Sequence, residues 1–435
     1  MHSIFAVLLA LTQQWLLVSD LHLDPFDHGS QPADYQQDTN PVLFDSAVAH
    51  MHKVAAGARV VIIDGDFLAH QFDQKAKAGA PNQTVSALAV QTMARIERSF
   101  AQAFPRAQFL IAMGNNDDPC GDYRTAPNTP YLAQLARIWA PLVNRNGASP
   151  AFIRDFSRTG SYISRLPVPG LRAIVADDVY WSFFYRPCRG GVSGMPRAEM
   201  NWFTQAVRAV PPGQRSVVVL HIPPGIDPSS TLLAQRFLVV PFWRNDMTAR
   251  FTQALGENES RVAFVVAGHL HRNDFRIAGG APILISPAIS PVYSNNPAFL
   301  TLQIDSRGTL RNYQMYAFDL YSDTWSRVFD YDSAYGVDNF TARSIEAAHA
   351  RIGRDDAMRE RWERALLADS GAYKARYVWR AFWCAQTELR AGYAACAGDQ
   401  RRVVLLPIGL ALLALVVVLA VTALVVRRGR QRRRT

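Results

Sequence analysis

The chain has 435 residues, of which 49% are apolar and 19% are charged, so it can bury one large core or two smaller ones. Its formal net charge is +10, but six of the arginines lie in the terminal stretch RRGRQRRRT, and without them the net charge is +4. The basic charge is therefore no evidence for a nucleic-acid-binding protein, and no nucleic-acid partner is indicated.

The N-terminal residues contain a short apolar stretch. Residues 1–13 include IFAVLLAL, which has the character of the apolar region of an export signal, although no Lys or Arg precedes it. We treat residues 1–13 as a possible signal segment and expect the main domain to begin at residue 14.

Short apolar runs then recur along the chain, with helical or polar stretches between them. Continuous β-branched runs of this length are typical of strands buried on both faces, which predicts a layered α/β core. Helical patterns cover Val85 to Ala103 and Arg197 to Val210, whereas Gln71 to Thr84 has the Gly, Pro and Asn content of a surface loop. The expected strands contain the runs QWLLVSD, ARVVIIDGD, AQFLIAMGN, SVVVLHIPP, RVAFVVAGH, APILISP and FLTLQID.

The C-terminal part of the chain has a different composition. Residues 333–402 are rich in Ala, Arg and Glu with helical spacing, which predicts a helical C-terminal subdomain. Residues 403–426 contain no charged residue and would span about 36 Å as a helix, enough to cross a bilayer. We predict a transmembrane helix here rather than a buried core helix, because the basic tail 427–435 follows at once. Such a tail marks the cytoplasmic side, so the main domain is expected on the periplasmic or extracellular side.

Four cysteines occur, and their spacing excludes the close pairs of a zinc finger. An even number of cysteines in an exported domain suggests disulfides, and we predict the pairs Cys384–Cys396 and Cys120–Cys188. Four buried free thiols are the alternative if the domain is cytosolic.

The first five apolar runs each end at residues of the type that bind metals. The carboxyl ends of strands in a layered α/β fold share one edge, so side chains distant in sequence can meet there. A single histidine or Asp-Gly-Asp after a strand is usually structural, but five such endings in order are hard to assign to chance. These residues are Asp20 and His22, Asp64 and Asp66, Asn115, His221, and His269 and His271.

In order, the endings read D-x-H, GD, GN, H and GHxH, which resembles the calcineurin-like metallophosphoesterases. DLHLDPFDHG, GDFLAH, HIPPGID and GHLHRNDF are more closely similar to the acid sphingomyelinase-like phosphodiesterases within that family. The resemblance implies a catalytic domain over residues 14–332, built as a layered metallophosphoesterase β-sandwich flanked by helices.

Carried over motif by motif, the resemblance assigns seven ligands to two divalent ions. Two ions about 3.5–4 Å apart can clamp a phosphoryl oxygen and acidify a bridging water. Mixed imidazole and carboxylate ligands suit zinc, iron or manganese, with zinc as our first choice. The first ion is assigned Asp20, His22, Asp66 and His271, and the second is assigned Asp66, Asn115, His221 and His269.

One position departs from the family pattern. Asn116 stands where most of the family has a histidine that donates a proton to the leaving group, and an amide cannot supply that proton. We expect Asn116 to hydrogen-bond the phosphate and His70, in GDFLAH, to donate the proton instead. The alternative for His70 is a histidine on a surface loop.

The predicted activity is hydrolysis of a phosphodiester or related phosphate ester by metal-activated water, without a covalent enzyme intermediate. A phosphomonoesterase or polyphosphatase is one alternative. A non-catalytic protein that binds a phosphate ligand is another, favoured by Asn116 but opposed by the complete ligand set. The substrate, for example a lipid or a nucleotide, is not specified by any residue.

Overall fold

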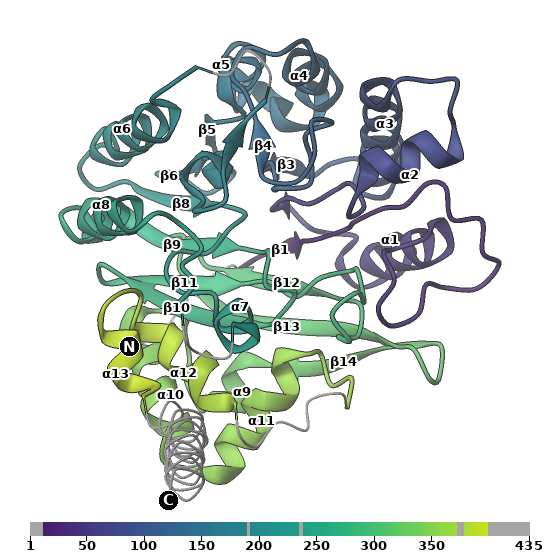
Figure 1. Cartoon of the computed structure of the whole chain (residues 1–435). Coiled ribbons are helices and arrows are strands. Elements are labelled where there is room, and N and C mark those ends of the chain that lie inside the picture. Colours follow the sequence, from purple (N-terminus) through teal and green to yellow (C-terminus); the bar gives the residue numbers. More distant parts are fainter. Residues whose placement is uncertain (1–11, 189–191, 235–237, 372–377, 399–435) are drawn as a thin grey trace, which may run out of the picture.

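The computed structural model describes residues 12–188, 192–234, 238–371 and 378–398. Two six-stranded sheets form its centre, with helices on their outer faces (Figure 1). This is the layered α/β architecture that the apolar runs predict. In spatial order, the first sheet consists of β14 (Thr324–Asp330), β13 (Leu310–Asp319), β12 (Ala298–Ile304), β1 (Gln13–Val18), β2 (Val60–Ile63) and β3 (Gln108–Ile111).

The second sheet repeats the same plan. Each sheet contains a set of neighbouring parallel strands: β1, β2 and β3 in the first, and β11, β9, β8 and β6 in the second. Antiparallel strands complete each sheet. In spatial order, the second sheet consists of β10 (Asp274–Ala278), β11 (Ala281–Ile285), β9 (Val262–Ala267), β8 (Arg215–Val219), β6 (Leu171–Val175) and β5 (Tyr162–Arg165).

Strand β8 shows why its sequence is apolar at successive positions. Val217 and Val219 belong to the core shared by the two sheets, whereas Val218 belongs to a second apolar cluster under the helices. Successive side chains of a strand point to opposite faces, and here both faces are buried. Trp15 of β1 and Phe264 of β9 meet in the shared core, with ring centroids 6.5 Å apart.

Helices cover the outer faces of the sheets and the end of the molecule near β13 and β14 (Figure 1). The predicted helix Val85 to Ala103 has those bounds, and the one at Arg197 to Val210 begins and ends two residues earlier. The helices are α1 (Pro41–Ala55), α2 (Phe72–Gly79), α3 (Val85–Ala103), α4 (Pro130–Val143), α5 (Phe152–Thr159), α6 (Met195–Arg208), α7 (Pro228–Leu233), α8 (Asn245–Gly256), α9 (Tyr331–Tyr335), α10 (Ala342–Ile352), α11 (Asp356–Leu366), α12 (Trp379–Thr387) and α13 (Gly392–Cys396).

The predicted surface loop at Gln71 to Thr84 is wrong over helix α2, Phe72–Gly79, whereas residues 80–84 form a turn and irregular structure as expected. Phe72 and Ala76 are buried one turn apart, and the Phe72 ring packs against Phe26 at 5.8 Å between centroids. Lys75 of the same helix forms ion pairs with Asp24 and Asp38. These tertiary contacts stabilise a short helix whose composition alone favours a loop.

Both predicted disulfides are present. Cys384 and Cys396 join α12 to α13, and Cys120 and Cys188 join the loop after β3 to the residue that follows β7 (Arg186–Pro187). β7 pairs with β4 (Arg124–Thr125), so the disulfide reinforces a small two-stranded sheet. The alternative of four buried free thiols is therefore wrong.

Helices α9 to α13 follow β14, where the sequence predicts a helical C-terminal subdomain. Within the described ranges, no helix is both long and apolar enough to cross a membrane. The predicted transmembrane helix 403–426, the tail 427–435 and nearly all of the possible signal segment lie outside those ranges.

Candidate metal centre

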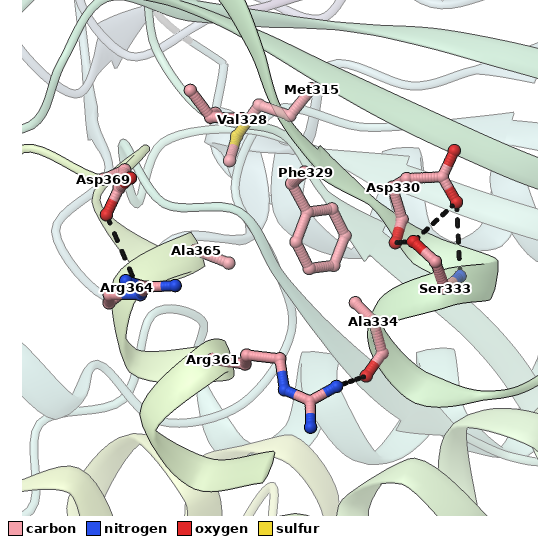
Figure 2. A pocket seen from close by; sticks show the side chains of 10 residues that line it. All are labelled: Met315, Val328, Phe329, Asp330, Ser333, Ala334, Arg361, Arg364, Ala365 and Asp369. Carbon is pink, nitrogen blue, oxygen red and sulfur yellow. Dashed lines mark hydrogen bonds and ion pairs between the residues drawn. The ribbon is translucent and has the colours of Figure 1, made fainter. Parts of the chain in front are cut away.

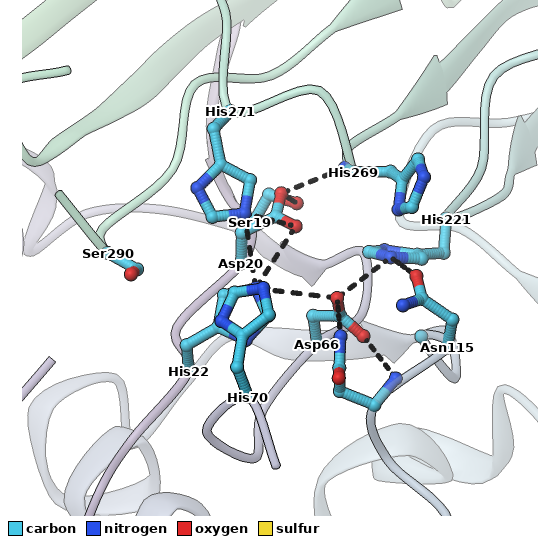
Figure 3. Close-up of polar contacts among 12 residues, drawn as sticks. Ser19, Asp20, His22, Asp66, His70, Asn115, His221, His269, His271 and Ser290 are labelled. Atoms are coloured by element: carbon cyan, nitrogen blue, oxygen red, sulfur yellow. Dashed lines mark hydrogen bonds and ion pairs between the residues drawn. The ribbon is translucent and has the colours of Figure 1, made fainter. Parts of the chain in front are cut away.

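The five predicted strand ends meet at one place between the two sheets (Figure 3). Three strands of the first sheet, β1, β2 and β3, end there, and so do two strands of the second sheet, β8 and β9. Within each sheet these strands are parallel, so their carboxyl ends lie at the same edge. The structure brings together all seven side chains assigned as ligands: Asp20, His22, Asp66, Asn115, His221, His269 and His271.

The first group of these side chains surrounds His22. Its Nε2 lies 3.1 Å from His271 Nε2, 3.4 Å from Asp66 Oδ2 and 3.7 Å from Asp20 Oδ1. His271 Nε2 is in turn 3.3 Å from Asp20 Oδ1. Two carboxylates and two imidazoles therefore converge in a buried space.

The second group surrounds His221. Its Nε2 lies 3.0 Å from Asn115 Oδ1 and 3.3 Å from Asp66 Oδ2. One potential ligand atom each of His269, His221 and Asp66 lie within 4.8 Å of one another. Asp66 Oδ2 thus stands between His22 of the first group and His221 of the second, which is where a shared ligand must be.

Five of the seven side chains are attached to backbone in the left-handed region. Asp and His occupy this region more readily than most residues, but it remains uncommon for any residue with a Cβ. Strained backbone of this kind persists where the surrounding fold enforces it, and it clusters at functional sites. The φ angles are 49° for Asp20, 41° for His22, 53° for Asp66, 69° for His269 and 53° for His271.

The glycines of the second and third motifs allow the backbone to come this close. A Cβ on Gly114 would lie 2.1 Å from Asp66 Oδ1, and one on Gly65 would lie 2.5 Å from His221 Nδ1. Gly65 also has a φ of +109°. Any larger residue at either position would push a candidate ligand out of place.

Hydrogen bonds behind the ligands fix which atoms face the centre. The Nδ1 of His22 lies 3.1 Å from the Leu68 carbonyl, and the Nδ1 of His221 lies 2.8 Å from the Asp64 carbonyl. A carbonyl can only accept, so each Nδ1 carries the proton and each Nε2 keeps its lone pair for the centre. In the same way, the Asn115 amide nitrogen donates to Asp122 Oδ1 at 2.7 Å, which turns the amide oxygen inward.

The chemistry of the donor set fits divalent cations. Asp20 is fully buried, and its Oδ1 has no partner in hydrogen-bond geometry within the described part of the chain. Burial alone would raise the pKa of this carboxyl, but His271 and His22 hold the pKa well below its usual range, so Asp20 is ionised. Burial and His221 lower the pKa of His269 to about 3, which leaves a neutral imidazole, whereas Asp66 and Asp20 raise the pKa of His221 well above its usual range although burial opposes this. Ionised carboxylates and neutral imidazoles are the ligands that zinc, iron and manganese accept.

The family model for calcineurin-like phosphoesterases matches residues 15–273, more than half of the chain and the whole span of the strand-end motifs. The chain belongs to the calcineurin-like phosphoesterase family. It is accordingly a metal-dependent phosphoric ester hydrolase.

Two curated relatives match most of this phosphoesterase. Sphingomyelinase phosphodiesterase D of Dictyostelium discoideum is 26% identical over 323 residues, which cover 70% of the chain and 67% of the relative. Acid sphingomyelinase-like phosphodiesterase 3b of Homo sapiens is 23% identical over 391 residues, which cover 79% of the chain and 81% of the relative. Among solved structures, a dimetal phosphatase from Danio rerio is 13% identical with a TM-score of 0.44, covering 70% of the chain and 95% of that structure.

Asn116 is hydrogen-bonded to the shared carboxylate. Its amide nitrogen donates to Asp66 Oδ2 and its backbone N–H donates to Asp66 Oδ1, both at 2.8 Å. Both oxygens of the shared carboxylate are therefore held by one residue. This contact with a candidate metal ligand is not anticipated from the sequence, and the predicted contact of Asn116 with the phosphate stays a prediction.

His70 lies in a turn at the edge of the first group. Its ring stacks on the His22 ring with centroids 3.9 Å apart, and its Nδ1 lies 2.7 Å from Asp38 Oδ1. Lys75 binds the other oxygen of Asp38 at 2.6 Å. Because 30% of the His70 side chain is exposed, it can contact a molecule that enters from solvent.

Several residues of the site have no counterpart in the sequence prediction. Asp117 accepts hydrogen bonds from the backbone of Gly114 and Asp66 and so joins the second and third motifs. The Tyr123 hydroxyl lies 3.1 Å from His269 Nε2. Asp117 is part of the MGNNDD stretch and could have been noted there, but no pattern in the sequence points to Tyr123.

A separate pocket of about 210 Å³ lies between β14, α9 and α11 (Figure 2). Phe329 and two arginines, Arg361 and Arg364, line it. Arg361 donates to the Ala334 carbonyl, and Arg364 pairs with Asp369. None of the candidate ligands lines this pocket, so it is distinct from the metal centre.

Proposed function

We propose that this phosphoesterase hydrolyses a phosphodiester of the sphingomyelin type by attack of water, with no covalent enzyme intermediate. The observation that carries the proposal is the position of Asp66, whose Oδ2 is 3.4 Å from His22 Nε2 and 3.3 Å from His221 Nε2. The names of the two curated relatives support a diester rather than a monoester as substrate.

In this proposal seven residues hold two divalent ions, with zinc, iron and manganese as candidates. When bound, such ions supply Lewis acidity toward the phosphoryl oxygens and lower the pKa of a coordinated water. Asp66 is shared, and Asn116 orients it. The first ion has Asp20, His22, Asp66 and His271 as ligands, and the second has Asp66, Asn115, His221 and His269.

His70 is the proposed proton donor to the leaving oxygen. The Asp38 carboxylate fixes the Nδ1 proton of His70, and the exposed remainder of the ring is free to meet the substrate. Asp38 also forms an ion pair with Lys75 of α2, so the folded chain fixes the carboxylate that orients the His70 ring. A substrate whose leaving group needs no proton would not depend on His70.

We further propose that residues 403–426 anchor the protein in a membrane, with the domain on the extracytoplasmic side. The uncharged run and the six arginines that follow it support this placement. The two disulfides agree with an oxidising compartment.

The test uses chelated protein to which zinc, manganese or iron is returned. Bis(p-nitrophenyl) phosphate, p-nitrophenyl phosphate and sphingomyelin vesicles are the substrates, and the Asp66→Asn variant is the control. We expect metal-dependent release from the diester in excess of the monoester. A preference for the monoester would indicate a phosphomonoesterase or polyphosphatase, and metal binding without turnover of any substrate would indicate a binding protein.

A further inference from the structure

A buried arginine lies behind the second group of ligands. Arg276 is on β10 of the second sheet and is only 1% exposed. Its guanidinium donates to the carbonyl of Pro224 and, at 2.8 Å, to the carbonyl of Ile226. Both carbonyls belong to the loop that begins at His221, so the arginine is attached to the backbone that carries a candidate ligand.

Other hydrogen bonds hold parts of this loop: the N–H groups of His221 and Ile222 donate to the Asp178 carboxylate, and the Gly225 carbonyl accepts from the N–H of Phe242. The loop sequence HIPPGI contains two prolines, which have no N–H to donate. Gly225 lies directly on the arginine: a Cβ there would be 3.0 Å from Arg276 Nη1 and 2.8 Å from Leu389 Cδ2. The absence of a side chain at Gly225 therefore leaves room for the guanidinium. The guanidinium in turn donates to two backbone carbonyls of a loop whose prolines have no N–H groups.

The same arginine also supports His269. Its Cζ lies 5.2 Å from the centroid of the Phe242 ring, and that ring lies 5.3 Å from the His269 ring. Arg276 thus touches the supports of two ligands of the second group. The nearest connections of the first group, such as the Leu68 carbonyl behind His22, do not involve it.

The C-terminal helices are attached to the same strand. Asp274, two positions before Arg276 on β10, accepts from Trp362 Nε1 of α11 at 3.1 Å and from Gln386 Nε2 of α12 at 2.7 Å. Leu389, just beyond α12, packs against Gly225. A continuous set of contacts therefore runs from α11 and α12 through β10 to the His221 loop.

We propose that Arg276 is a positioning residue for the second metal ion, through which the C-terminal helices hold the His221 loop. A buried guanidinium is costly unless it is hydrogen-bonded, and here each of its two Nη atoms donates to a carbonyl of that loop. The inference rests on the proposed function only in taking His221 and His269 as metal ligands.

The test compares the full chain with Arg276→Met, Arg276→Lys and a matched control, Arg215→Met. Arg215 is partly buried at the opposite end of β8, where it donates to Thr309 Oγ1 and the Ala263 carbonyl. Dissociation constants for both zinc ions are measured by competition with a chelator, together with the thermal unfolding temperature. Hydrolysis of bis(p-nitrophenyl) phosphate is followed as a separate readout.

We expect Arg276→Met to weaken one of the two zinc sites by about 10- to 100-fold, the usual cost of losing a group that orients ligands, and to leave the other within about threefold. Lysine should restore part of the affinity, and Arg215→Met should leave both sites unchanged. If Arg276→Met does not fold, Gln386→Met, which removes the hydrogen bond from α12 to Asp274 of β10 together with the one to His349 of α10, should weaken the same site selectively.

Equal weakening of both sites, or two unchanged sites, would overturn the inference. So would the same selective loss in Arg215→Met. Because zinc binding is measured without turnover, a chain that binds as expected but hydrolyses nothing would refute only the proposed function.

Discussion

The substitution Asn116→Ala tests how the shared carboxylate is held. It removes the hydrogen bond from the Asn116 amide to Asp66 Oδ2 and keeps the backbone hydrogen bond to Oδ1. A hydrogen bond to a charged group contributes about 1.5–3 kcal/mol, which corresponds to about 10- to 100-fold in an equilibrium constant. We therefore expect a loss of metal affinity of that size, with most of kcat regained at saturating metal.

The assay is a metal titration of activity and of binding, with Asn312→Ala as a matched control. Asn312 is also buried and also donates its amide to a carboxylate, that of Asp330, but it lies outside the metal centre. The reasoning is refuted if Asn116→Ala binds both ions as the wild type does while kcat falls more for alkoxide than for nitrophenolate leaving groups. Asn116 would then act on the substrate.

Four further outcomes are expected. His70→Ala should slow diesters with alkoxide leaving groups by about 10²- to 10⁴-fold and nitrophenyl esters far less, and an equal loss on all substrates would exclude His70 as the proton donor. Asp66→Asn should abolish activity and weaken both ions, as strong chelation should for the wild type; turnover by metal-free protein would contradict the two-ion reading. Burial raises the pKa of Asp118 to about 6, so ionisation above that pH destabilises the fold. Asp118→Asn should therefore raise the free energy of unfolding at pH 7 by about 1–3 kcal/mol, and this gain should shrink as the pH falls from 6 toward 4 in urea titrations. A reporter fused after Thr435 should behave as cytoplasmic and one near Ala395 as exported, and the reverse would refute the proposed topology.

Much of the fold is visible in the sequence because its central strands are buried on both faces. Every residue of β2 and β9 is buried, and such strands read as unbroken apolar runs. Strand β13 is missed by this criterion because its buried residues alternate with partly exposed ones. Helix α2 is missed because contacts with Phe26 and Asp38, distant in sequence, outweigh its composition.

The candidate site, like the fold, is only partly predictable from the sequence. The candidate ligands can be found in the sequence because each lies shortly after an apolar run that predicts a strand. The carboxyl ends of such strands share one edge of the sheet, so the position of a residue after the run predicts its place in the fold. Asp38 and Tyr123 lie in loops, and only the folded chain shows that they meet His70 and His269. For Asn116 the sequence shows which residue replaces the usual histidine, but the partner of its amide, Asp66, depends on the approach of two loops.

The division of the ligands between two sheets has a consequence for the order of events during biogenesis. Asp20 emerges from the ribosome early and His271 late, and the candidate ligands between them follow strands of both sheets. No local segment can capture an ion and fold around it, as a zinc finger does. If these residues hold two ions as proposed, loading is expected to follow assembly of both sheets. Each ion would then join one sheet to the other, and its binding would stabilise the folded chain.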